Sequence, residues 1–197
     1  MPRRKIQFEK GAYYHIYNRG ADRRSIFLNP ENYRYATELI ETYLTPLQIT
    51  MIAYCLLPNH YHWLVRQHGE AKAGLLAQRV FNAYVKAFNN SNDRSGTLFE
   101  DRYSAIVVSS DEYLRHLCRY IHANPVRHGL ATAPELWPHS NYLDWIEQRS
   151  SKLVDQTFVK VHFPAPGAYQ TYVESYLTGQ VKLPAGLGTY LDELENG

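Results

Sequence analysis

An apolar run from Tyr54 to Val65 carries two histidines one residue apart, His60 and His62. Side chains alternate between the two faces of a strand, so these two imidazoles point the same way. Two imidazoles on one face can hold one metal ion between them. Burying an imidazole without a partner costs free energy, so the pair indicates a site. The alternative is a pair of structural histidines that are hydrogen-bonded within the sheet.

Periodicity and turn residues assign seven elements before residue 125. They are strands at 13–18, 47–57, 60–67 and 103–109 and helices at 30–44, 71–90 and from 111 onward. This order predicts an α+β fold of ferredoxin-like type, with one antiparallel sheet and helices packed on one face. The helix from residue 111 lies outside that repeat. Further on, a kink at Pro125, one further turn that stops at Gly129, and helices at 142–148 and 169–177 are predicted.

Composition describes an ordinary globular chain, with 45% hydrophobic and 20% charged residues. No apolar run approaches the roughly 20 residues of a membrane span, and the start does not resemble a signal peptide. Cys55 and Cys118 lie in apolar segments and are too few for a disulfide framework, so we expect reduced thiols. These features predict a cytoplasmic protein without a membrane partner.

Charge is unevenly distributed along the chain. Residues 1–130 hold 17 Lys and Arg against 11 Asp and Glu, whereas residues 131–197 hold 4 against 8. A basic body suits a polyanionic partner, and an acidic tail can shield it when that partner is absent. We therefore divide the chain into a domain at 1–149 and a partly helical accessory tail at 150–197.

The helix from residue 111 carries Tyr120 and Asn124, four residues apart and hence on one helix face. Tyr120 lies at the edge of the apolar stripe, where its ring can be half packed and its hydroxyl available. For this tyrosine alone, a boundary residue with no chemical role is the simpler interpretation.

Four segments together resemble a known family. Leu57-Pro58-Asn59-His60-Tyr61-His62 resembles the His-hydrophobic-His (HUH) motif of single-tyrosine transposases, and more narrowly the Pro-Asn-His-x-His signature of the REP-associated tyrosine transposases. The segments at 14–20, 96–103 and 119–130 agree in order and spacing with that family's opening strand, the approach to its fourth strand and its tyrosine helix. Two departures are a large Tyr61 in the middle HUH position and His128 where a small residue is usual.

The resemblance implies a chemistry. Members of this family cut and rejoin single-stranded DNA through a 5′-phosphotyrosine, with a divalent metal bound by the HUH histidines. Carried over here, the nucleophile is Tyr120 and the metal ligands are His60, His62 and Asn124. Mg²⁺ or Mn²⁺ is implied, although a histidine pair alone would also suit zinc.

The implied substrate is single-stranded DNA that carries an imperfect hairpin of the repetitive extragenic palindromic (REP) kind. Candidates for contacts to the DNA backbone are cationic residues in the arm, loops and tyrosine helix: Arg3, Arg4, Lys5, Arg19, Arg102, Arg119 and Arg127. The chain could act as a monomer or a homodimer, since some relatives exchange the tyrosine helix between subunits. Two alternatives stay open, a hairpin-binding protein that does not cut and a zinc hydrolase in which Tyr120 is structural.

Overall fold

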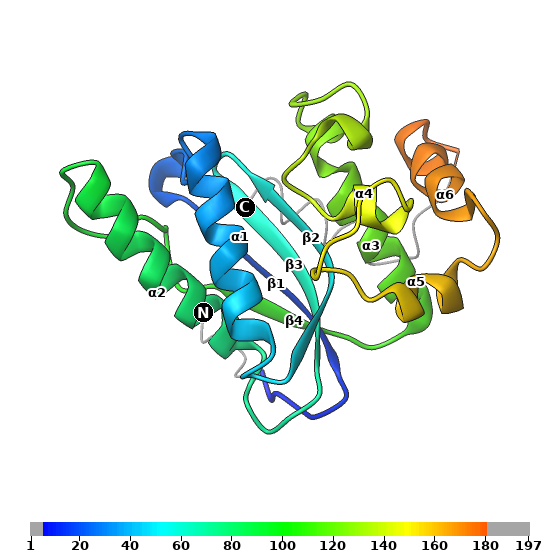
Figure 1. Cartoon of the computed structure of the whole chain (residues 1–197), viewed down its shortest axis with the longest axis horizontal. Helices are drawn as coiled ribbons and strands as arrows, with labels where there is room; N and C mark the ends of the chain where they lie inside the picture. Colours follow the sequence, from blue (N-terminus) through cyan, green and yellow to red (C-terminus); the bar gives the residue numbers. More distant parts are fainter. Residues whose placement is uncertain (1–5, 181–197) are drawn as a thin grey trace.

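The computed structural model describes residues 6–180 (Figure 1), so the predicted basic arm at Arg3, Arg4 and Lys5 lies outside the described residues. The elements run in the order β1 (Tyr13–Arg19), α1 (Pro30–Leu44), β2 (Ile49–Leu57), β3 (His60–Gln67), α2 (Gly74–Ser91), β4 (Ser104–Val108), α3 (Asp111–Arg127), α4 (Tyr142–Trp145), α5 (Gln156–His162) and α6 (Ala168–Leu177). Short 3-10 turns occupy Ala21–Arg23 and Pro134–Leu136. No helix among residues 6–180 is long and apolar enough to cross a bilayer.

The four strands form one antiparallel sheet in the order β2-β3-β1-β4. This is the arrangement expected of a ferredoxin-like α+β fold, which confirms the prediction. β3 is central and pairs with both β1 and β2, so both of its edges are hydrogen-bonded. The four predicted strands are found to within two residues of their expected ends.

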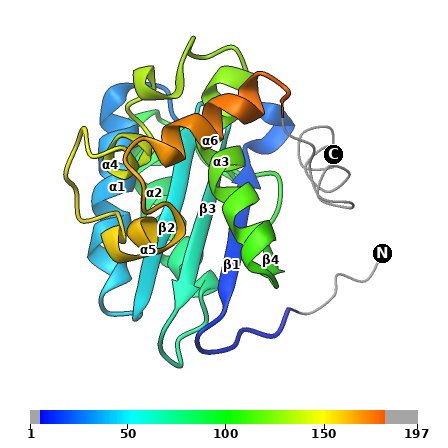
Figure 2. The ribbon, with the colours of Figure 1, turned by 90° about the vertical axis from the view of Figure 1, so that its right-hand side faces the viewer.

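The two faces of the sheet carry separate apolar cores. On one face, Tyr61, Trp63 and Val65 pack with α1 and α2. On the other, Leu64 packs with Leu117 and Ile121 of α3, and α4, α5 and α6 complete this layer. Figures 1 and 2 show α1 and α2 on one side of the sheet and α3 to α6 on the other. The tyrosine helix is therefore separate from the ferredoxin-like pair of helices, as predicted, and it covers the opposite face.

Local signals explain where the helices begin. Asn29 caps α1 by accepting a hydrogen bond from the amide of Asn32, at 3.0 Å, and Pro30 occupies the first helical position. Ser110 caps α3 in the same way by accepting from the amide of Tyr113, at 3.1 Å. Both starts agree with the sequence-based predictions.

The predictions after residue 125 are confirmed in part. α3 continues through Pro125 to Arg127 and Gly129 follows with a positive φ of 67°, as predicted, and α6 matches the helix predicted at 169–177. α4 ends at Trp145 rather than near residue 148, because Glu147 adopts a positive φ of 59° that a helix cannot continue. α5 was missed, although Asp155 gives it a start signal by accepting from the amide of Phe158, at 2.9 Å.

The described part of the predicted tail packs on the sheet and α3. Phe158, Tyr169 and Val173 are buried in the same apolar core as α3. Cys55 and Cys118 are buried free thiols in that core, as expected. A boundary at residue 150 and an accessory role for the tail stay predictions, and residues 181–197 lie outside the described part.

Asn141 ties the C-terminal part of this layer to the edge strand β2. Its amide nitrogen donates to the carbonyl oxygens of Ile52 and Leu153, each at 2.9 Å. Its oxygen accepts from the amide of Tyr54 at 2.8 Å and lies 2.8 Å from Nε2 of His122. Asn141 is fully buried, so every one of these bonds is made away from water.

His122 belongs to the same buried network. Its Nδ1 is hydrogen-bonded to the hydroxyl of Tyr169, so the ring links α3 to α6 as well as to Asn141. Burial lowers the pKa of His122 to about 4, an effect that its bond to Asn141 opposes and the charge of Arg149 adds to. The folded protein therefore holds this imidazole neutral at pH 7.

Asn141→Ala is expected to destabilise the protein by about 2–4 kcal/mol, because it leaves several buried donors and acceptors without partners. Urea unfolding followed by circular dichroism measures the loss. Asn92→Ala is the matched control, since the exposed Asn92 donates a single bond to the carbonyl of Phe88, at 2.8 Å. Equal stabilities of the two variants would contradict the role given to Asn141.

The neutral state of His122 predicts a pH dependence. Because its folded pKa lies below the unfolded value of about 6.5, its contribution to stability is complete above that pH and is lost as the pH falls toward 4. The slope is roughly 1.4 kcal/mol per pH unit in this window. Unfolding free energies of the wild type and His122→Gln, measured from pH 7.5 to 5, should show a shallower slope for the variant. Identical slopes would refute the assignment.

Candidate active site

The two histidines of the HUH motif open β3 and face α3. His62 is 4% exposed, and His60 at the end of the strand is half-buried. Their ring centroids are 5.2 Å apart and the rings are nearly perpendicular, at 84°. Alternation along β3 sends Tyr61 and Trp63 into the opposite core, so the pair shares one face as the sequence predicts.

Tyr120 reaches this pair from α3. The centroid of its ring lies 5.5 Å from that of His62, in an edge contact at 76°. Tyr120 is only 1% exposed, although the sequence predicted a half-packed ring. The apolar stripe of α3 is buried on more sides than its periodicity indicates, because both the sheet and α6 pack against this helix.

Asn124 follows Tyr120 by one helical turn. Its Nδ2 donates to the carbonyl oxygen of Tyr120 at 2.9 Å, which fixes the amide plane. Within the described residues, Oδ1 of Asn124 is buried and accepts no hydrogen bond. A buried acceptor without a donor is costly, so this oxygen is suited to a ligand that supplies positive charge.

The electrostatics of the pair favour neutral imidazoles. Burial, with smaller contributions from the nearby His128 and Arg19, lowers the pKa of His60 to about 3. Burial also holds the pKa of His62 well below its ordinary value, with smaller contributions from His60, His15 and His128. A neutral imidazole has a lone pair available, which is the form that binds metals.

His60 and His62 can form a three-ligand site for a divalent metal only if the side-chain amide of Asn124 is the third ligand. Among residues 6–180, no group of three or more histidine, cysteine, aspartate or glutamate side chains is arranged to hold a metal. Two imidazoles and the buried oxygen of Asn124 are the donors that β3 and α3 provide. Such a set leaves positions open for a substrate and for water.

Two further histidines adjoin the pair and were not predicted as site residues. Nε2 of His15 lies 3.0 Å from Nδ1 of His62, and both side chains are buried. His128, which follows α3, places its ring centroid 5.0 Å from that of His60. Alternation in β1 indicates which face His15 occupies, but its contact with His62 depends on β1 being the neighbour of β3.

The arginines that were predicted to bind DNA differ in their exposure and in their contacts. Arg19 forms an exposed ion pair with Glu100, at 3.2 Å, and its Cα pairs in register with that of His60. Arg102 and Arg127 are exposed, and Nη1 of Arg127 donates to the hydroxyl of Tyr176 at 2.8 Å.

Arg119 requires a correction. It is fully buried, and its guanidinium carbon lies 4.5 Å and 4.8 Å from the ring centroids of Tyr172 and Tyr176. The guanidinium cannot reach DNA in this conformation, because α6 covers it. Its position on the inner face of α3 is not evident from the sequence, since arginine is usually exposed.

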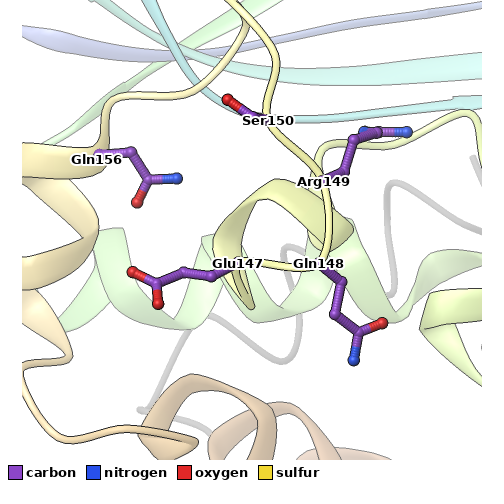
Figure 3. A pocket seen from close by; sticks show the side chains of 5 residues that line it. All are labelled: Glu147, Gln148, Arg149, Ser150 and Gln156. Carbon is purple, nitrogen blue, oxygen red and sulfur yellow. The ribbon is translucent and has the colours of Figure 1, made fainter.

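A surface hollow of about 350 Å³ lies elsewhere, after α4 and at the start of α5 (Figure 3). It is lined by Glu147, Gln148, Arg149, Ser150 and Gln156. None of the residues predicted to act in catalysis or metal binding is among them. The hollow is therefore not the candidate site.

Comparisons with known proteins agree with this geometry. The family model described as IS200-like transposase matches residues 9–124, more than half of the chain, including both histidines and Tyr120. A Haemophilus influenzae protein assigned to the REP-associated tyrosine transposases is 24% identical over 152 residues, which cover 68% of this chain and 82% of the relative.

A solved structure, described as a REP-associated tyrosine transposase bound to a REP hairpin, supports the fold. It superposes with a TM-score of 0.65 at 18% identity and covers 79% of this chain and 94% of that chain. The resemblance inferred from the four sequence segments is thereby confirmed. The chain belongs to the IS200-like transposase family, and the relatives that it resembles here are REP-associated tyrosine transposases.

Proposed function

We propose that this protein is a metal-dependent DNA transesterase that cuts and rejoins single-stranded DNA through a 5′-phosphotyrosine on Tyr120. The observation that carries the proposal is the contact of His62 with Tyr120, whose ring centroids are 5.5 Å apart. A metal-binding motif and a nucleophile from distant parts of the chain meet there across one face of the sheet. Family membership supports the same activity.

His60, His62 and Asn124 would hold the metal. The buried, unpartnered Oδ1 of Asn124 and the neutral imidazoles support this assignment. Because all three ligands are neutral, none of them offsets the charge of the cation. The bound metal would neutralise the non-bridging oxygens of the scissile phosphate and orient the phosphorus. Mg²⁺ or Mn²⁺ is proposed, and the two nitrogen ligands favour Mn²⁺ of the two.

The chemistry exchanges one phosphodiester for another. The hydroxyl oxygen of Tyr120 forms a bond to phosphorus, the bond from phosphorus to the 3′ oxygen breaks, and the phenolic proton passes to that oxygen. The products are a 5′-phosphotyrosine and a free 3′-hydroxyl. Since one phosphodiester replaces another and no ester bond is lost to water, a 3′-hydroxyl can reverse the attack and rejoin DNA.

The burial of Tyr120 sets a condition on this activity. At 1% exposure its hydroxyl cannot contact a strand of DNA, so part of the surrounding packing has to open before attack. The same observation favours a second candidate function, a hairpin-binding protein that does not cut. A zinc hydrolase would use three protein ligands of the histidine or carboxylate type, and residues 6–180 contain no group of three such side chains placed to hold a metal.

We propose hairpin DNA of the REP kind as the substrate, which is the DNA in the solved structure described above. Arg19, Arg102 and Arg127 are the proposed backbone contacts in the described part of the chain. The ion pair of Arg19 with Glu100 is exposed and therefore weak, so a phosphate can replace the carboxylate. Arg119 is not included, because it is buried.

Tyr120→Phe removes one oxygen and should abolish both cleavage and the covalent adduct, because no other group then attacks the phosphate. Hairpin binding should change by less than about threefold. The measurement is incubation with labelled hairpin DNA and Mg²⁺ or Mn²⁺, followed by a denaturing gel. Tyr113→Phe, two turns earlier on α3, is the matched control and should keep activity.

Undiminished cleavage by Tyr120→Phe would end the claim that Tyr120 is the nucleophile. If the wild type binds the hairpin tightly but never forms an adduct with either metal, the non-cutting alternative is correct instead.

A further inference from the structure

The site contains a buried pair of imidazoles whose purpose is not explained by the proposed reaction. His15 on β1 is fully buried, and its Nε2 lies 3.0 Å from Nδ1 of His62. The two rings are nearly parallel, at 23°, with centroids 5.2 Å apart. A polar side chain in the centre of a sheet face is costly unless it is hydrogen-bonded, and His62 supplies that bond.

A hydrogen bond between two neutral imidazoles contains one hydrogen, so the pair has two possible arrangements. If Nε2 of His15 donates, His62 carries its own hydrogen on Nε2, and neither of its nitrogens can bind a cation. If Nδ1 of His62 donates, its Nε2 has a lone pair available on the side of the ring away from His15. The choice between these tautomers decides whether His62 can act as a ligand.

We propose that His15 is a positioning residue that accepts the hydrogen from Nδ1 of His62 and so presents the Nε2 lone pair of His62 to the site. The bond occupies Nδ1, which leaves Nε2 as the only nitrogen of His62 that can serve the site. This inference rests on the proposed metal-binding role of His62. The corresponding arrangement in known metal sites is a ligating histidine whose other nitrogen donates to a neighbouring acceptor.

The packing around His62 agrees with a ring held in one orientation. The ring of Tyr17 lies 6.0 Å away and nearly parallel, at 30°, while Tyr120 makes its edge contact at 5.5 Å. His60 adds a second edge contact at 5.2 Å. Aromatic contacts restrict how the ring lies, whereas the hydrogen bond to His15 involves Nδ1 of His62 directly and can therefore select its tautomer.

The first measurement is made on the metal-free wild-type protein. Nitrogen-15 NMR of the imidazole rings distinguishes a nitrogen that carries hydrogen from one with a lone pair. His62 is expected to carry its hydrogen on Nδ1. A hydrogen on Nε2 of His62 would overturn the proposal without any variant being needed.

The second measurement compares variants for Mn²⁺ binding in the absence of DNA. His15→Phe keeps a ring but removes the acceptor, so the Kd should rise about 10–100-fold and the tautomer preference of His62 should be lost. His15→Gln places an amide oxygen near the position of Nε2 and should restore both to within a few-fold of the wild type. His139→Phe, a half-buried histidine that stacks on Tyr33, is the control and should bind Mn²⁺ normally.

Wild-type affinity in His15→Phe would show that the pair is only structural and would overturn the proposal. His62→Ala separates this failure from that of the proposed function. If His62→Ala binds Mn²⁺ as tightly as the wild type, the metal assignment is wrong, and the tautomer in the metal-free protein alone decides the role of His15.

Discussion

The structure depends on the position of β3 between two apolar layers. One set of its side chains enters the core under α1 and α2, and the alternate set faces α3. A shift of one residue in the pairing of this strand would exchange the two sets. His60 and His62 would then enter the aromatic core under α1 and α2, whereas Tyr61 and Trp63 would face α3, and Tyr120 would lose its contact with His62. The register of β3 is therefore the constraint on which the candidate site depends.

The segment from Asn141 to α6 stabilises this arrangement by packing against α3 and the sheet. Asn141 is hydrogen-bonded to the edge strand β2, to the chain at Leu153 and to His122 of α3. The helix that carries Tyr120 is thus attached to the sheet by polar bonds as well as by apolar packing. The layer that stabilises α3 also buries Tyr120 and Asn124, so it closes both side chains to DNA in this structure.

Much of this could be predicted from the sequence, because the signals were local. Period-two alternation, helical periodicity and the four family segments predicted the sheet, its helices and the histidine pair. The remainder depends on tertiary packing. His15 meets His62 only because β1 lies beside β3, and Arg119 is buried only because the tyrosines of α6 cover it. The local sequence around a single histidine or a helical arginine does not indicate such neighbours.

We propose that the histidines of β3 and the amide of α3 converge on one cation beside Tyr120. Crystals soaked in Mn²⁺ test this arrangement, since anomalous scattering locates the metal without assumptions about its ligands. We expect one strong peak about 2.0–2.4 Å from an imidazole nitrogen of His60, from Nε2 of His62 and from Oδ1 of Asn124. A peak at another site, with these three groups unliganded at a saturating Mn²⁺ concentration, would contradict the account.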